Sequence, residues 1–206
     1  MARNIFRGLG IALVTPFTSD GQVDYKSLKR LVEYQIDNGA DFLCILATTG
    51  ETPCLTQDEK DKITQLVKDV NHGRLPILKG CGGNNTAAVV EELRTADWSG
   101  IDGILSVCPY YNKPSQEGLY QHFKAIAEAS PLPVVLYNVP GRTGINLKPE
   151  TTVRLANDCE NIVAVKEASG SLEQVDEIIK NKPQRFDVLS GDDALTFSMV
   201  ASGAAG

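Results

Sequence analysis

Two lysines lie directly after short apolar runs, where an amine can act as a nucleophile. Lys166 follows the run 162–165, and Lys79 follows the run 77–78. Partial burial there favours the neutral amine, the form that attacks a carbonyl carbon to give a Schiff base. The alternative for Lys166 is a salt bridge with a carboxylate such as Glu167, and the sequence alone gives the two equal weight. Composition does not separate Lys166 from Lys79, although its neighbours give Lys166 a slight lead.

Polar side chains that could assist such an amine follow other apolar runs. Tyr137 ends the run before that of Lys166, and a phenol beside an amine can relay protons during imine formation. Arg142 lies in a predicted turn beyond it and could hold a substrate carboxylate by two hydrogen bonds, although a surface arginine is the commoner case. Thr48 and Thr49 offer hydroxyl groups for the carboxylate of a keto acid. These residue types favour imine chemistry on a keto acid.

Two further segments lie at the ends of predicted strands. Ser190 and Gly191 end another apolar run, at the same edge as the lysine and the tyrosine. The aromatic pair Tyr110 and Tyr111 precedes a predicted helix. Such pairs in loops more often serve packing or interfaces than catalysis.

The composition excludes several classes of function. The 206 residues are 42% hydrophobic and 22% charged, as expected of one globular domain. A net charge of −6 without a basic stripe predicts neither a nucleic-acid partner nor an anionic membrane surface. The two histidines are far apart, so we expect no metal site and no Ser-His-Asp triad. Five scattered cysteines suit reduced thiols, and no apolar run is long enough to span a membrane, which predicts a cytoplasmic protein.

Short apolar runs without polar alternation recur along the chain, which is typical of parallel strands buried on both faces. Seven strands are expected, at 10–14, 42–46, 77–78, 103–107, 134–137, 162–165 and 188–189. Amphipathic segments predict helices between them, at 25–38, after a capping box at Thr56, and at 84–98, 115–129, 149–157, 171–181 and 192–202. This alternation predicts a parallel sheet with right-handed crossovers.

Two α/β architectures compete for this pattern. A doubly wound sheet usually carries a glycine-rich phosphate turn after its first strand, and segment 13–17 lacks one. Polar residues instead crowd the carboxyl ends of several strands, which favours a (β/α)8 TIM barrel. Such barrels typically need about 250 residues. We therefore interpret residues 1–206 as a single (β/α)8-barrel catalytic domain that is truncated before the eighth strand, with its C-terminal part missing.

Three segments resemble one enzyme family. Segments 109–123, 137–144 and 165–170 are similar to the 4-hydroxy-tetrahydrodipicolinate synthases, also called dihydrodipicolinate synthases, and the resemblance covers nearly the whole chain. It implies a lyase that condenses pyruvate with aspartate 4-semialdehyde through a lysine Schiff base. The product is 4-hydroxy-tetrahydrodipicolinate, on the route to diaminopimelate and lysine. The resemblance also implies no cofactor beyond the covalent imine, and a homotetramer built as a dimer of dimers.

The resemblance implies a role for each candidate residue. Lys166 would form the imine with pyruvate, and Tyr137 would relay protons to and from the bound substrate. Thr49 would assist Tyr137, together with Tyr111 contributed by a neighbouring subunit. Arg142 would hold the carboxylate of the semialdehyde. The residues that would line the pyruvate pocket are Thr48, Thr49 and Gly191.

The chain departs from the family pattern at a regulatory site. The family's feedback site for lysine would keep Asn84 and Tyr110. Gln57, Lys60 and Ala88 stand where lysine-sensitive members often carry two histidines and a glutamate, which argues against inhibition by lysine.

Two other functions remain open at the level of the sequence. One is a related pyruvate-dependent aldolase that acts on a sugar acid, of the sialic-acid lyase type. Arg142 discriminates between this aldolase and the synthase, because a sugar-acid aldolase has less use for a cation placed to receive the carboxylate of the semialdehyde. The other is an inactive fragment of the synthase, suggested by the short chain.

Overall fold

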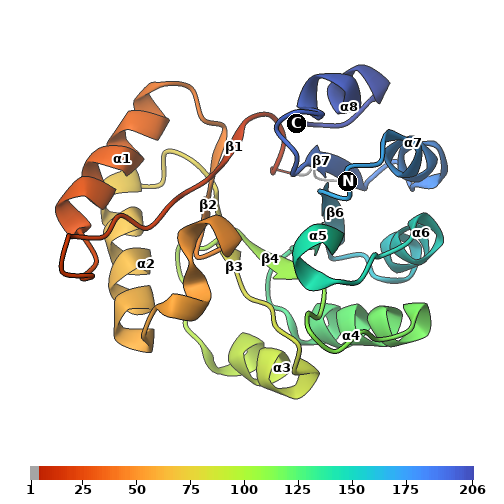
Figure 1. The fold of residues 1–206 in the computed structure, drawn as a ribbon, viewed down its shortest axis with the longest axis horizontal. Coiled ribbons are helices and arrows are strands. Elements are labelled where there is room, and N and C mark those ends of the chain that lie inside the picture. Colours follow the sequence, from red (N-terminus) through yellow and green to blue (C-terminus); the bar gives the residue numbers. More distant parts are fainter. Residues whose placement is uncertain (1–4) are drawn as a thin grey trace.

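The computed structural model describes residues 5–206, which form one parallel sheet with the strands in sequence order. The strands are β1 (Gly10–Ala12), β2 (Phe42–Ile45), β3 (Ile77–Gly80), β4 (Gly103–Val107), β5 (Val134–Asn138), β6 (Ile162–Glu167) and β7 (Asp187–Ser190). The sheet curls around a central axis and the helices lie on its outer side (Figure 1). These are seven strands of a (β/α)8 barrel, as the alternation of apolar runs and amphipathic segments predicts.

Helices connect successive strands, and a last helix follows β7. They are α1 (Tyr25–Asp37), α2 (Gln57–Asn71), α3 (Thr86–Thr95), α4 (Gln116–Ala129), α5 (Pro140–Thr143), α6 (Pro149–Asp158), α7 (Leu172–Asn181) and α8 (Thr196–Ser202). Short 3-10 turns at Thr48–Gly50 and Thr52–Cys54 follow β2, and neither these turns nor α5 was predicted from the sequence. None of the helices within residues 5–206 is both long and apolar enough to cross a membrane.

Local sequence signals set most of the helix starts. At α2 the predicted capping box is present, because the Thr56 side chain accepts from the Glu59 amide and the Glu59 carboxylate accepts from the Thr56 amide at 2.8 Å. The start predicted for the last helix is wrong: α8 begins at Thr196 rather than at Asp192. The Ser190 hydroxyl donates to the Asp192 carbonyl at 2.9 Å, which holds this segment in a turn.

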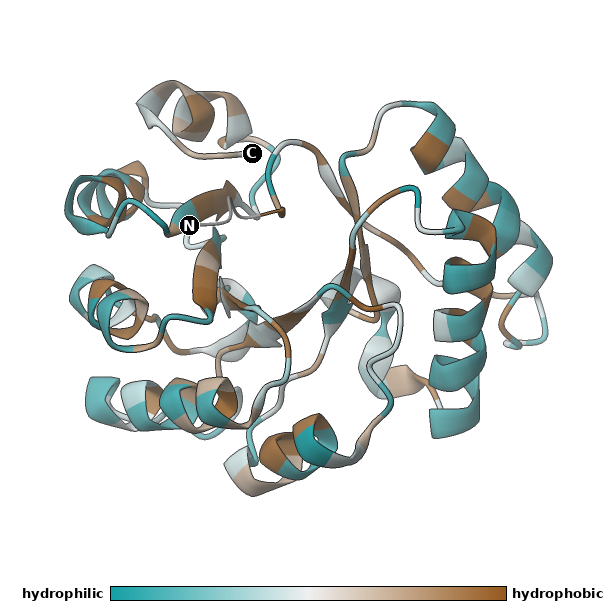
Figure 2. Ribbon diagram, turned by 180° about the vertical axis from the view of Figure 1, so that it is seen from behind, coloured by the Kyte–Doolittle hydropathy of each residue, from teal (hydrophilic) through white to brown (hydrophobic). Residues whose placement is uncertain are grey.

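Both faces of the sheet are buried, as expected for strands that lack polar alternation. One face packs against the helices in two apolar clusters that include Ile45 and Ile104. The other face lines the barrel interior with side chains such as Leu78, Leu105 and Val135. The hydrophobic residues follow the strands and the inner sides of the helices, while the outer sides are hydrophilic (Figure 2). Residues along the strands thus face the helices and the interior in turn, except at Val163 and Ala164 of β6, which both pack in the interior cluster.

The segment Ala204–Gly206 lies along the free edge of β7. The Ala205 amide donates to the Val188 carbonyl, and the Ser190 amide donates to the Gly206 carbonyl, both at 2.8 Å. On its other side, the Ala205 carbonyl accepts from the Gly8 amide at 2.9 Å. These main-chain bonds connect β7 to the residues that precede β1, so the sheet curls round to meet its own beginning.

His122 on α4 is a buried histidine with one hydrogen-bond partner. Its Nδ1 lies 2.8 Å from the Thr86 hydroxyl on α3, and its Nε2 has no hydrogen-bond partner among the described residues. Burial lowers the pKa of the His122 imidazole to about 4, because the charged form loses its hydration. The pKa of an unfolded histidine is about 6.5.

His122 should therefore make the protein less stable in mild acid. The contribution of neutral His122 to stability is complete above the pKa that its imidazole has in the unfolded chain. It is lost as the pH falls toward the pKa in the folded protein, because the unfolded chain then binds a proton that the folded protein excludes. Between pH 7.5 and 5.5 this costs about 1 kcal/mol of unfolding free energy. His122→Gln keeps a partner for Thr86 but cannot titrate. Urea unfolding at the two pH values should show a smaller loss in the variant, and an equal loss would contradict this assignment.

Candidate active site

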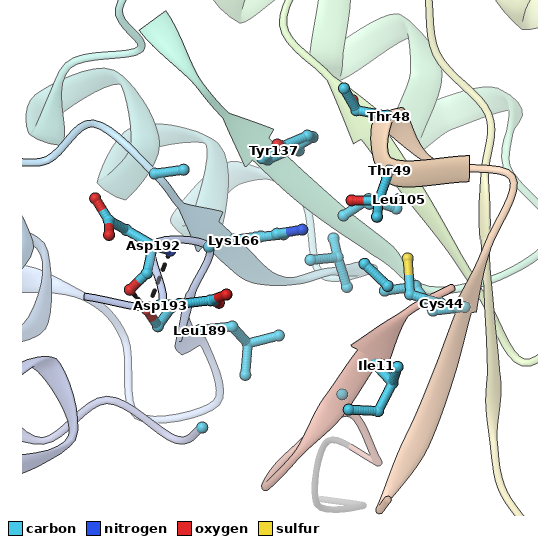
Figure 3. A pocket seen from close by; sticks show the side chains of 18 of the residues that line it. Ile11, Cys44, Thr48, Thr49, Leu105, Tyr137, Lys166, Leu189, Asp192 and Asp193 are labelled. Carbon is cyan, nitrogen blue, oxygen red and sulfur yellow. Dashed lines mark hydrogen bonds between the residues drawn. The ribbon is translucent and has the colours of Figure 1, made fainter. Parts of the chain in front are cut away.

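A cavity of about 760 Å³ occupies the barrel interior and reaches residues that follow the carboxyl ends of β2, β5 and β7. Most of the site residues predicted from the sequence line it, namely Thr48, Thr49, Tyr137, Arg142, Lys166 and Gly191. They come from segments spread over most of the chain, and the curled sheet brings them together. The Lys166 side chain extends into this cavity beneath Tyr137, with Thr49 beyond it (Figure 3).

Lys166 and Tyr137 face each other across two neighbouring strands. They are directly paired in the β5–β6 ladder, so their side chains leave the same face of the sheet. The Lys166 Nζ lies 4.6 Å from the centroid of the Tyr137 ring. This contact places an amine and a phenol within reach of one small carbonyl substrate.

The salt bridge between Lys166 and Glu167 does not form. The two residues are adjacent on β6, so their side chains point to opposite faces of the sheet. Glu167 lies under α7 and accepts a hydrogen bond from Gln174. Lys166 makes no ion pair anywhere in the described part of the chain, so its amine stays available to the cavity.

Lys79 is excluded from the cavity by the same alternation. It is paired with Ile45 and Ile104, whose side chains pack against the helices. The Lys79 side chain is 8% exposed, and its Nζ lies 5.1 Å from the centroid of the Trp98 ring on the outer side of the sheet. The structure therefore separates the two amines that the sequence left as rivals, and only Lys166 faces the interior.

Tyr137 is a buried phenol whose environment acts in both directions. Burial raises the pKa of Tyr137, and this effect is partly offset by a hydrogen bond with Thr48 and by the charge of Arg142. The phenol therefore carries its proton at neutral pH and is equipped to donate it. Cys44 lines the same cavity, and burial raises its thiol pKa to about 11, so it stays protonated. Cys44 is not among the site residues predicted from the sequence, although strand alternation from Phe42 places it on the interior face.

The turn that carries Thr48 and Thr49 depends on an unusual backbone. Leu46, just after β2, has φ +50°, a conformation that costs a non-glycine residue about 1 kcal/mol or more. Gly80 on β3 packs against this bend so closely that an added Cβ would lie 2.0 Å from the Leu46 carbonyl oxygen. On the far side, the Thr15 hydroxyl donates to the Gly50 carbonyl at 2.7 Å. The two threonines are thereby aimed at the cavity.

Gly191 stands directly against the Lys166 side chain. A Cβ at Gly191 would lie 2.9 Å from Lys166 Cε, so any side chain there would displace the lysine. The Gly191 amide donates to the Glu167 carbonyl at 2.8 Å, which ties the loop after β7 to the end of β6. Asp193 in this loop also lines the cavity, and it is not among the site residues predicted from the sequence.

Arg142 lies on α5 at the boundary between two cavities. It lines the main cavity and also a second one of about 350 Å³, and both share Thr48 and Tyr137. The helix α5 is capped at its C-terminal end by Gly144, whose amide donates to the Pro140 carbonyl at 2.9 Å. A guanidinium in this place can reach a carboxylate without occupying the space next to Lys166.

The remaining predicted residues lie outside the main cavity. Tyr110 lines the second cavity, and its carbonyl accepts from the Asn84 side chain at 3.0 Å. Tyr111 is 88% exposed with φ +73°, and it does not line either cavity. Within residues 5–206, no three His, Cys, Asp or Glu side chains gather in a way that could hold a metal ion.

A model of the dihydrodipicolinate synthetase family matches residues 5–206, which is nearly the whole chain. The chain belongs to this family. The fold and the resemblance seen in the sequence are therefore confirmed at the level of the family.

Known members of the family are similar throughout the chain. A 4-hydroxy-tetrahydrodipicolinate synthase of Phocaeicola vulgatus is 60% identical over 206 residues, which is 100% of this chain and 69% of that protein. The one of Bacillus subtilis is 50% identical over 202 residues, covering 98% of this chain and 69% of the relative. The crystal structure of dihydrodipicolinate synthase from Thermotoga maritima superposes with a TM-score of 0.94 at 44% identity, covering 98% of this chain and 70% of that one.

The support that Gly80 gives to the threonine turn can be tested by adding one methyl group. Gly80→Ala should force the Leu46 bend and the two threonines out of place, because the clash is with backbone. We expect a loss of about 1–3 kcal/mol of unfolding free energy, together with a loss of activity. Urea unfolding and steady-state kinetics measure the two effects. Gly83→Ala is the matched control, since its Cβ would meet only Val89 Cγ2 at an ordinary 3.6 Å. Equal behaviour of the two variants would contradict the role of Gly80.

Proposed function

We propose that this protein is a lyase that condenses pyruvate with aspartate 4-semialdehyde to give 4-hydroxy-tetrahydrodipicolinate, in diaminopimelate and lysine biosynthesis. The observation that carries the proposal is the Lys166 amine, which faces the barrel interior against Tyr137. The relatives that are 50% and 60% identical are named for this synthase, and they match 98% and 100% of this chain.

The first step is formation of an imine. The Lys166 amine adds to the keto carbon of pyruvate, and the resulting hydroxyl leaves as water after it takes up a proton. The imine draws electrons from the neighbouring methyl group, which loses a proton and becomes the carbon nucleophile that attacks the aldehyde. The lysine itself is the electron sink, so the proposal includes no cofactor and no metal.

Tyr137 is placed to move these protons. Its phenol is buried, keeps its proton at neutral pH and stands over the Lys166 Nζ. Thr48 interacts with the phenol, and Thr49 lines the same side of the cavity, so a hydroxyl relay can return the proton to solvent. We assign Thr48, Thr49 and Gly191 to the pocket of pyruvate, whose carboxylate would accept from hydroxyl and main-chain donors.

Tyr111 is assigned to a neighbouring subunit. Its side chain is 88% exposed and lines neither cavity of its own chain, as expected of a residue that serves another protomer. The proposal therefore includes a homotetramer in which paired subunits exchange Tyr111, and a cytoplasmic location. The single barrel domain of residues 1–206 would supply the remaining groups itself.

Asn84 and Tyr110 are proposed as the retained part of a regulatory site for lysine. Lys60 lines the cavity beside Tyr110, and its positive charge opposes the binding of a cationic amino acid there. This arrangement agrees with weak or absent feedback by lysine.

Trapping with borohydride tests the proposed imine. Pyruvate followed by reductant should add one reduced pyruvate to Lys166, and mass spectrometry of the peptides should locate it there. Lys166→Ala should abolish the adduct, whereas Lys79→Ala is the matched control and should retain it, because Lys79 lies on the other face of the sheet. An adduct at Lys79, or none in the unmodified protein, would contradict the proposal.

Arg142 should act chiefly on the second substrate, because its charge is a smaller influence on the pKa of Tyr137 than burial and the Thr48 hydrogen bond. Arg142→Gln removes the guanidinium that would bind the carboxylate of the semialdehyde. We expect the KM of the variant for the semialdehyde to rise by about 10-fold or more, which is the effect of one lost charge-assisted hydrogen bond. Pyruvate trapping at Lys166 should stay unchanged. Arg154→Gln, which removes a surface arginine paired with Glu117, should alter neither. An unchanged KM in Arg142→Gln would overturn the assignment and favour a sugar-acid aldolase.

A further inference from the structure

A buried carboxylate lies directly behind Lys166 and Tyr137, on the opposite face of the sheet. Glu167 is 1% exposed. Its two oxygens accept from the Ser169 amide at 2.7 Å, from Asn138 Nδ2 at 3.1 and 3.2 Å, and from Gln174 Nε2 at 3.0 Å. Within residues 5–206 it makes no ion pair with a lysine or an arginine. A buried carboxylate served only by neutral donors is costly, so its presence calls for a specific task.

Asn138 connects this carboxylate to the segment that follows Arg142. The Asn138 side chain is fully buried, and its Oδ1 accepts from the Leu147 amide at 3.0 Å. Its Nδ2 also donates to Asn146 Oδ1 at 2.8 Å, and Asn146 in turn donates to Gln174 on α7 at 2.8 Å. One hydrogen-bonded network therefore holds the ends of β5 and β6 and the loop after α5.

The β5–β6 ladder has a feature that makes such a network useful. The pairing advances from Val134 opposite Ile162 to Val135 opposite Ala164, so one residue of β6 is skipped. A shift of one residue in a strand exchanges its two faces. In the neighbouring register Lys166 would point toward the helices and Glu167 toward the cavity. The Asn138–Glu167 pair lies at the far end of the ladder, beyond the irregularity, where it can select one register.

We propose that Glu167 and Asn138 are positioning residues, which hold β5 and β6 in the register that sets the Lys166 amine against the Tyr137 ring. The inference rests on the proposed function, because imine formation is the step that needs this contact. Neither side chain lines the cavity. Their effect therefore falls on the rate of imine formation and not on the binding of pyruvate.

Glu167→Gln tests the inference with almost no change of shape. The NH2 group of the new glutamine can only donate, and it would face the donor NH2 group of Asn138 or of Gln174. One of the hydrogen bonds of the network would therefore be lost. Because a misplacement of about 1 Å can cost up to about 100-fold in rate, we expect kcat and the trapping rate at Lys166 to fall by about 10-fold or more. The KM for pyruvate should stay within about 2-fold, as expected when binding is untouched.

Two further variants distinguish positioning from general stability. Asn138→Asp combined with Glu167→Gln places an acceptor opposite the new amide, so the cross-strand bond and part of the rate should return. Ile178→Val on α7 is the control, because Ile178 packs in the same apolar layer without a hydrogen bond to either strand. It should lower stability and leave kcat unchanged.

The outcomes are separable. A wild-type trapping rate in Glu167→Gln overturns the inference, and so does a double variant no faster than Glu167→Gln, or an equal loss of kcat in Ile178→Val. If the unmodified protein forms no pyruvate adduct, the proposed function fails instead. The rate at which acetic anhydride labels Lys166 then decides the inference: an unchanged rate in Glu167→Gln overturns it, and a changed rate supports it.

Discussion

In the β5–β6 ladder, Tyr137 stands opposite Lys166 and Asn138 stands opposite Glu167. Because successive side chains leave opposite faces of a strand, this single register produces two different environments. The first pair meets in the barrel interior, and the second pair is buried under the helices. The cavity, the separation of the lysine from its neighbouring carboxylate and the polar network behind the sheet all depend on it.

The same alternation determines which face of the sheet each of the two lysines occupies. Lys79 and Lys166 both end apolar runs, yet Lys79 stacks on Trp98 outside the sheet while Lys166 extends into the cavity. On the outer side of the sheet the Lys79 amine packs against an indole ring, which suits a structural role. The Lys166 amine instead shares the main cavity with hydroxyl groups and a phenol. Location on one face or the other therefore separates packing from chemistry.

The barrel interior combines rigid and strained elements. Gly80 and Gly191 are positions where no side chain fits, one behind the Leu46 bend and the other against Lys166. The bend itself adopts φ +50°, and the packing around it compensates for that cost. Close packing of this kind holds the threonine turn and the lysine at fixed positions relative to each other, which is what covalent catalysis on a small substrate requires.

The sequence by itself determined the parallel strands, the helices between them and the family, because unbroken apolar runs, capping residues and three long segments are local features. It also supplied the amine, the phenol and the guanidinium of the candidate site. The family resemblance already favoured Lys166 over Lys79, but only the tertiary structure showed which face each lysine takes, removed the salt bridge with Glu167 and showed the bend at Leu46. These depend on strand register and on contacts between residues far apart in the chain, such as Gly80 with Leu46 and Asn138 with Glu167. A local sequence pattern does not determine which face of the sheet the side chains at a strand end will occupy, because a register shift of one residue exchanges the two faces.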